Sequence, residues 1–310
     1  LCTLGSINWG AFRNPQEMRK CCRVLVRSLS NLLNYQDFLS IQSKLANTDF
    51  EPLGVGITNL AYWHARKSFK YGTPEALAEV KRWMEHQAYY LTEASVELAQ
   101  ERGPCGRSQY TYYGKGVFPW ERRKEGVNEL TDFTPSMDWE PLRERMKKYG
   151  IRNATLMAVA PVESSSVVLN STNGIEMPME MISVKESKAG SFVQVVPEYK
   201  RLKNRYQLMW DQKDCVDYLK TSAVLAVYID QSLSTNTFYN PANYSGGKVP
   251  ATLIAKNLML AYKWGLKTIY YSLINKVGAK ADMTNTSSAI TLSPVTVYEE
   301  LDEDCEACKL

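Results

Sequence analysis

The stretch "KVPATLIAKNLMLAYKWGLKTIYYSLI", residues 248–274, decides the fold class. Its first part, 248–262, carries apolar residues at helical spacing, and Gly265 closes the helix. Residues 266–274 are apolar and β-branched, which predicts a buried strand directly after the helix. Successive side chains of a strand point to opposite faces, so Tyr270 and Tyr271 would each bury a phenol that needs a hydrogen-bonding partner. Ordinary core packing and a redox role both remain open for this pair.

The same alternation of helices and short strands runs along the rest of the chain. Apolar periodicity predicts helices at 16–34, 73–103, 139–150 and 214–235, and short strands at 156–160 and 191–199. The longest helix is bounded by Thr73 and Pro74 at its start and by Gly103 at its end. This alternation predicts an α/β fold with a mostly parallel sheet or barrel.

Other segments depart from this pattern. Residues 104–137 are rich in Gly, Pro, Tyr and charge, and their many aromatic residues predict a long ordered loop. The spacing within 16–34 puts Cys21 and Cys22 on or near the buried helix face, where we expect a structural role. From about residue 276 the periodicity ends and the chain becomes polar and then acidic, which predicts a flexible tail.

Composition limits the classes of function. The chain has 310 residues, 45% of them hydrophobic, and a net charge of +4, which gives no argument for a nucleic-acid partner. No window approaches the roughly 18 apolar residues of a membrane span, and no signal peptide opens the chain. The first residue is Leu rather than Met, so we expect a cleaved, trimmed or split product. Seven scattered cysteines favour a reducing compartment, and two histidines are too few for a histidine-based metal site.

One candidate site is "APVESSSVVL", residues 160–169, which follows the predicted strand 156–160. Unpaired backbone N–H groups at a helix start, together with serine hydroxyls, can cradle a phosphate. Ligands of α/β folds bind beyond the carboxyl ends of strands, as here. A serine-rich helix cap explains the same residues, and on local sequence alone it is the simpler explanation. The residues concerned are Pro161, Val162, Glu163, Ser164, Ser165 and Ser166.

Cysteines supply two further candidates. Cys305 and Cys308 form a C-x-x-C pair in "DCEACKL", which can cycle between dithiol and disulfide. Half a zinc site is the competing interpretation, but the last thirty residues offer no further ligands. Acidic neighbours would raise the pKa of these thiols. Cys2, at the start of an apolar strand, reads locally as a core residue.

Taken together, these pieces resemble the large (α) subunit of class I ribonucleotide reductase. The resemblance runs through nearly the whole chain, and five pieces carry it in the family's order: "LCTLGSIN", "APVESSS" with "NSTNGIE", "IDQSLSTNT", "GKVPATLIAKNLMLAYKWGLKTIYY" and the tail cysteine pair. It implies the second half of a ten-stranded α/β barrel with surrounding helices (residues 1–275) and a flexible redox tail (276–310). Val162 and Val167 depart from the residues that are usual in the family at these positions.

The resemblance also implies roles. A radical from a di-metal small subunit would pass through Tyr271 and then Tyr270 to a thiyl-forming cysteine. Cys2 would be one partner of the cysteine pair that reduces the ribose. Cys305 and Cys308 would re-reduce that pair by exchange and be renewed by thioredoxin or glutaredoxin. Residues 161–165 would hold the diphosphate of a ribonucleoside diphosphate, with Ser166 nearby, and the helix around 248–263 would dock the small subunit.

Several parts of the family pattern are missing from this sequence. The thiyl cysteine, the partner of Cys2 and the effector-binding regions all belong to the amino-terminal half, so we expect a separate polypeptide to supply them. We expect no metal or other cofactor on this chain itself, no membrane contact and a cytoplasmic location, in a bacterium or a phage-infected host. A non-catalytic half-barrel that only binds other subunits is the alternative, and a stand-alone thiol–disulfide protein is a weaker one.

Overall fold

The structure is a computed structural model that describes residues 3–187 and 190–275. The chain divides after Asn275 into two units, and the second lies outside the described residues. The predicted tail and its cysteines, Cys305 and Cys308, therefore fall outside them, as does Cys2.

Parallel strand pairs form the framework of the first unit. β1 (Leu4–Asn8) pairs with β2 (Gly54–Thr58) in parallel, with Leu4 opposite Gly54 and Asn8 opposite Thr58. β5 (Thr237–Tyr239) pairs in parallel with β6 (Ser272–Ile274). A single parallel bridge joins Val159 to Leu233 between these two pairs.

Backbone hydrogen bonds connect the two pairs through an extended segment at 155–159. Val55 N donates to Leu156 O (2.8 Å), and Ser234 N donates to Val159 O (2.8 Å). Five extended segments therefore lie side by side, and their order in space is their order along the chain. They are 4–8, 54–58, 155–159, 231–239 and 270–275. This arrangement confirms the α/β class with parallel strands, although the described residues form short sheets and no closed barrel.

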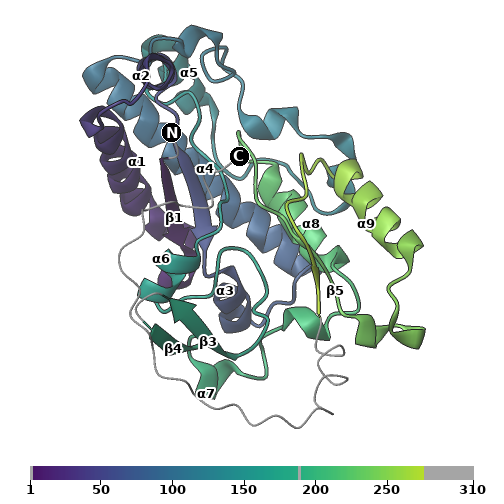
Figure 1. Cartoon of the computed structure of the whole chain (residues 1–310). Coiled ribbons are helices and arrows are strands. Elements are labelled where there is room, and N and C mark those ends of the chain that lie inside the picture. The colour runs from purple at the N-terminus through teal and green to yellow at the C-terminus, as the bar shows by residue number, and fades with distance from the viewer. Residues whose placement is uncertain (1–2, 188–189, 276–310) are drawn as a thin grey trace. The chain divides into compact units, whose positions relative to one another are not determined.

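Helices connect and cover these segments (Figure 1). The longer ones are α1 (Met18–Tyr35), α2 (Ile41–Phe50), α4 (Pro74–Arg102), α5 (Glu140–Tyr149), α8 (Val216–Ala226) and α9 (Ala251–Lys263). The shorter ones are α3 (Leu60–Lys67), α6 (Glu163–Val168) and α7 (Tyr199–Leu202). An antiparallel hairpin of β3 (Ile182–Ser187) and β4 (Gly190–Val195) lies beside α7 at the lower end of Figure 1.

The core is centred on α4, most of whose side chains are buried. Three buried indoles, Trp9, Trp63 and Trp83, lie with ring centroids 5.2–5.5 Å apart. On the outer side, α1 and α4 are joined by three ion pairs that recur every four residues, namely Arg19–Glu93, Arg23–Glu97 and Arg27–Glu101. Apolar packing and this row of charges together hold α1 against α4.

Several predicted elements are confirmed and others need correction. The helices predicted at 16–34, 73–103, 139–150 and 248–262 are present with small shifts of their ends, but the helix predicted at 214–235 stops at Ala226. Cys22 is buried as expected, whereas Cys21 is exposed because adjacent helix positions point about 100° apart. The segment 191–199 contributes to the antiparallel hairpin rather than to the parallel set.

The strand predicted at 266–274 was the least accurate element. Regular pairing begins only at Ser272, and the tyrosines lie just before it. The expectation of a buried strand was wrong at this point, because Tyr270 and Tyr271 are 54% and 55% exposed.

Candidate active site

The two adjacent tyrosines lie in direct contact with each other. Their ring centroids are 4.1 Å apart, and Tyr271 Oη donates a hydrogen bond to Tyr270 Oη over 3.3 Å. Both phenols are therefore on the same side of the chain, instead of on opposite faces as regular strand geometry would require. The hydrogen bond with Tyr270 raises the pKa of Tyr271. Two phenols at this distance can exchange an electron and a proton.

The serine-rich turn forms the short helix α6, directly after the extended segment 155–159. Ser166 is buried, its N–H donates to Val162 O (2.8 Å), and its hydroxyl donates to Glu163 O (2.8 Å). That hydroxyl is thus committed to the turn itself. Ser164 and Ser165 are exposed on the first turn of α6. Two of the three serines therefore face outward, together with the first backbone N–H groups of the helix.

Glu163, the first residue of α6, acts on the tyrosine pair only through its charge. Its carboxylate makes the smallest contribution to the raised pKa of Tyr271, whose main cause is the hydrogen bond with Tyr270.

Polar residues that the sequence did not single out hold these segments in place. Asn173 accepts a hydrogen bond from Val162 N (3.2 Å) and so fixes the entry to α6. Asn236 accepts one from Tyr271 N (3.0 Å). Both lie in stretches already noted for their resemblance, "NSTNGIE" and "IDQSLSTNT". The amide side chains within these two stretches were the available signal, but the sequence does not say which backbone group each would bind.

Asp230 is a third such residue. Its buried carboxylate accepts hydrogen bonds from Leu156 N (2.7 Å), Met157 N (3.0 Å) and Tyr113 Oη (2.8 Å). Burial raises the pKa of Asp230 to about 6, although the two backbone N–H donors act in the opposite direction. Asp230 thus ties the segment leading to α6 to the loop 104–137.

The described cysteines and histidines have the character of packing residues. Burial raises the thiol pKa of all four described cysteines, Cys21, Cys22, Cys105 and Cys215, so none is an activated nucleophile. His64 is stacked on Tyr71, and His86 lies in α4 with its Nδ1 2.8 Å from Arg82 O. Within 3–187 and 190–275, no cluster of His, Cys, Asp or Glu could hold a metal ion. The helices described there include none that is long and apolar enough to cross a membrane.

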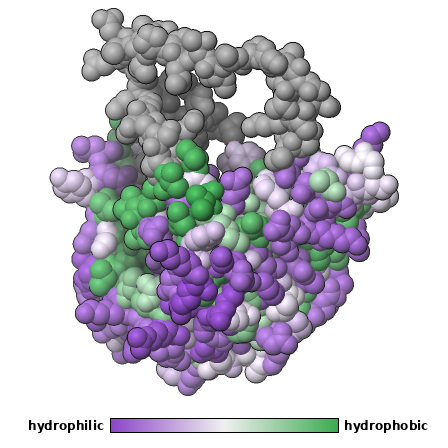
Figure 2. Space-filling model, turned by 90° about the horizontal axis from the view of Figure 1, so that it is seen from below, coloured by the Kyte–Doolittle hydropathy of each residue, from purple (hydrophilic) through white to green (hydrophobic). Residues whose placement is uncertain are grey.

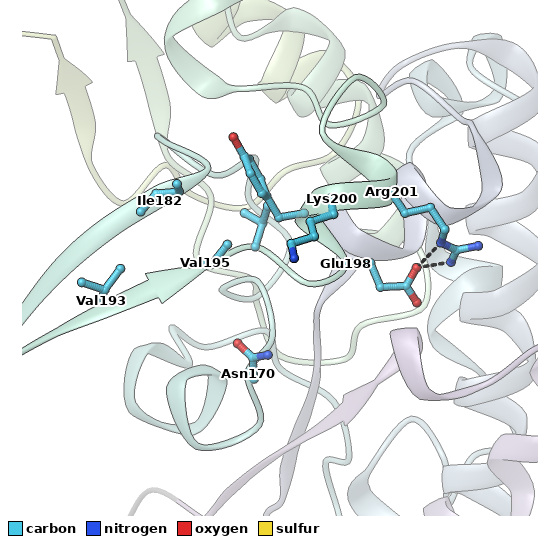
Figure 3. A pocket seen from close by; sticks show the side chains of 9 residues that line it. Asn170, Ile182, Val193, Val195, Glu198, Lys200 and Arg201 are labelled. Carbon is cyan, nitrogen blue, oxygen red and sulfur yellow. Dashed lines mark hydrogen bonds and ion pairs between the residues drawn. The ribbon is translucent and has the colours of Figure 1, made fainter.

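A pocket of about 850 Å³ lies between the β3–β4 hairpin and α7, and Asn170, just after α6, also lines it. Figure 3 shows Ile182, Val193 and Val195 along the hairpin side, and the ion pair of Glu198 with Arg201 on the other. The view from below also shows an apolar patch on the surface (Figure 2). None of the described candidate residues, Pro161–Ser166 and Tyr270–Tyr271, lines this pocket. Its lining is mainly apolar, which does not suit the chemistry of phosphates or phenols.

The chain is similar in sequence to known proteins of one family. Residues 1–272 match the family described as "Ribonucleotide reductase, barrel domain". The chain is 41% identical over 271 residues to the ribonucleoside-diphosphate reductase subunit alpha of Buchnera aphidicola subsp. Baizongia pistaciae, covering 87% of this chain and 36% of the relative. It is 38% identical over 312 residues to the subunit alpha of Haemophilus influenzae (100% of this chain, 39% of the relative). For the subunit alpha of Enterobacteria phage T4 the identity is 34% over 314 residues (100% and 40%).

The chain therefore spans about two fifths of the length of these relatives. The match runs from β1 to the first residue of β6 and includes α6 and the tyrosine pair. On this match, the chain belongs to the ribonucleotide reductase family, in which it corresponds to the barrel domain.

Proposed function

We propose that this chain is the carboxyl-terminal part of the large subunit of a ribonucleoside-diphosphate reductase. It would contribute the second half of a ten-stranded barrel, formed by its five adjoining extended segments, followed by a redox tail at 276–310. The observation that carries the proposal is the tyrosine pair, with hydroxyls 3.3 Å apart and rings 4.1 Å apart. Exposed phenols in direct contact are suited to passing a radical in from a partner protein.

In this proposal the pair relays a radical. A di-metal small subunit removes an electron and a proton from Tyr271, which recovers both from Tyr270. Tyr270 recovers them in turn from a cysteine of the amino-terminal part, leaving a thiyl radical that takes the ribose 3′ hydrogen. The exposure of Tyr270 and Tyr271 supports the first and last of these steps, since both need contact with another chain.

The substrate would bind at residues 161–166. The outward N–H groups at the start of α6 and the exposed hydroxyls of Ser164 and Ser165 suit a diphosphate. Ser166 would act only through the turn that it closes. The Glu163 carboxylate repels a phosphate, so we expect its side chain to face the nucleoside or Tyr271 instead.

Cysteines would supply the reducing equivalents. Cys2 and a partner thiol from the amino-terminal part are oxidised to a disulfide, which provides two electrons and two protons while the 2′ hydroxyl leaves as water. Cys305 and Cys308 then reduce that disulfide by exchange and are themselves reduced by thioredoxin or glutaredoxin.

Partner chains complete the proposal. An amino-terminal polypeptide would carry the thiyl cysteine and the nucleotide-effector sites. The small subunit would dock on α9, whose exposed side chains Leu258, Met259 and Tyr262 offer an apolar contact surface. We place the complex in the cytoplasm, where thiols stay reduced.

The test is a reconstitution. The chain is combined with an amino-terminal partner, a class I small subunit, effector and dithiol, and formation of deoxyribonucleotide from a labelled ribonucleoside diphosphate is followed. Tyr271→Phe should abolish turnover, because Phe cannot lose a proton with its electron. Tyr110→Phe, a change at another exposed tyrosine, should leave it intact. A complex that forms but gives no turnover with the native chain would favour a non-catalytic binding partner.

A further inference from the structure

The hydrogen bonds around the tyrosine pair reveal an irregularity in the β5–β6 ladder. Thr237 lies opposite Ser272, and Thr237 N donates to Tyr271 O (2.9 Å). In a regular parallel ladder, Thr235 O would then accept from Tyr271 N. It accepts instead from Tyr270 N (2.8 Å). The β6 side therefore carries one extra residue at this point, which is a β-bulge.

The bulge explains the contact between the phenols. Regular strand geometry would send the side chains of Tyr270 and Tyr271 to opposite faces. An extra residue turns one of them, so that both rings lie on the same side and their hydroxyls meet at 3.3 Å. The exposed surface around the rings supplies little packing to enforce this arrangement, since both are more than half exposed. The backbone must enforce it.

The bulge leaves Tyr271 N without its ladder partner, and a side chain replaces that partner. Asn236 Oδ1 accepts from Tyr271 N at 3.0 Å. We propose that Asn236 is a positioning residue that holds the bulge and thereby keeps the two phenols in contact. Its effect on turnover rests on the proposed function, but its effect on the phenol contact does not.

Glu176 orients the Asn236 amide. Asn236 Nδ2 donates to Glu176 Oε1, which fixes the amide so that its oxygen faces Tyr271 N. Because Glu176 lies on the segment that follows α6, the same bond links the region after the serine-rich turn to the tyrosine pair. An alanine at 236 would remove both bonds and let the Tyr271 backbone move away from β5.

The first readout does not depend on enzyme activity. With 3-fluorotyrosine at position 271, the ¹⁹F shift followed against pH reports the pKa of that phenol in the chain alone. The native contact should hold this pKa above that of free 3-fluorotyrosine. Asn236→Ala should return it to the free value. Asn240→Ala is the matched control, because Asn240 also accepts a backbone N–H, from Ala242, and should leave the pKa raised.

The second readout is turnover in the reconstituted enzyme. A misplacement of about 1 Å can cost about 10²-fold, so Asn236→Ala should lower kcat by that order with KM unchanged. The double change Asn236→Asp with Glu176→Gln should restore kcat. The carboxylate at 236 still accepts from Tyr271 N, and it now accepts a second bond from the amide at 176. An unchanged pKa in Asn236→Ala would overturn the proposal. If Asn236→Ala loses the raised pKa while the native chain gives no turnover, the positioning role is supported and the proposed function is contradicted.

Discussion

Replacing Asp230 by Asn tests how the extended segment 155–159 is held in place. The carboxylate accepts two backbone N–H groups, of Leu156 and Met157, and the hydroxyl of Tyr113. Burial opposes ionisation of the native carboxyl through loss of solvation, and these donors favour ionisation. The loss of solvation dominates, so the pKa of Asp230 is higher in the folded state than in the unfolded state.

The size and sign of the effect follow from that difference. The pKa of Asp230 rises from an ordinary value of 3.8 to about 6. At about 1.4 kcal/mol per pKa unit, the shift corresponds to about 3 kcal/mol. Because the folded state binds the proton more tightly, this stabilisation is complete below about pH 4 and is lost as the pH rises through about 6. Asparagine does not titrate and removes this dependence.

The assay is urea denaturation of the native chain and of Asp230→Asn at several pH values. Other titrating groups cancel in the difference between the two unfolding free energies. We expect that difference, native minus variant, to fall by about 2.5 kcal/mol between pH 4 and pH 7.5, since part of the unfolded chain is already ionised at pH 4. A constant difference across this range would refute the reasoning, because it would mean that Asp230 titrates alike in both states.

Two further changes address the core and the strand contacts. Glu85→Ala should lower the unfolding free energy by about 3–5 kcal/mol, because it leaves the buried Lys81 ammonium without its partner. In the native chain that ammonium lies 2.9 Å from the Glu85 carboxylate. A loss below about 1 kcal/mol in urea denaturation would contradict this. Gly56→Ala should cost about 1–3 kcal/mol, because a Cβ there would lie 2.6 Å from the backbone oxygen of Ala158. Gly5→Ala on the neighbouring strand meets only flexible leucine methyl groups at 3.1 Å and should cost less, so equal losses would argue against close backbone contact as the cause.

Local signals in the sequence predicted most of the longer helices, but not α2 or α3. Pro74 and Gly103 mark the two ends of α4, and Gly103 takes a positive φ of 82° that glycine adopts without strain. The turn at 160–169 was correctly expected to start a helix after an extended segment. These features depend on residues close together in the chain, which is why the sequence is informative about them.

Features that depend on distant residues were not predictable. Tyr270 and Tyr271 read as a buried strand because their neighbours are apolar, whereas the bulge arises from pairing with Thr235 and Thr237. Asn236 and Asp230 are polar residues in a family-like stretch, but their partners lie on other segments. The assignments of Cys2, Cys305 and Cys308 rest on resemblance and stay predictions.

The central claim, that a radical passes through the tyrosine pair, can be tested by electron paramagnetic resonance. Tyr271 is replaced by 3-aminotyrosine, which is easier to oxidise and traps a radical. The chain is then mixed with the amino-terminal partner, the small subunit, substrate and effector. We predict that the small subunit's radical decays as an aminotyrosyl radical appears, and that the same analogue at Tyr110 gives no such signal. An assembled complex in which the small subunit's radical persists and position 271 stays silent would contradict the account.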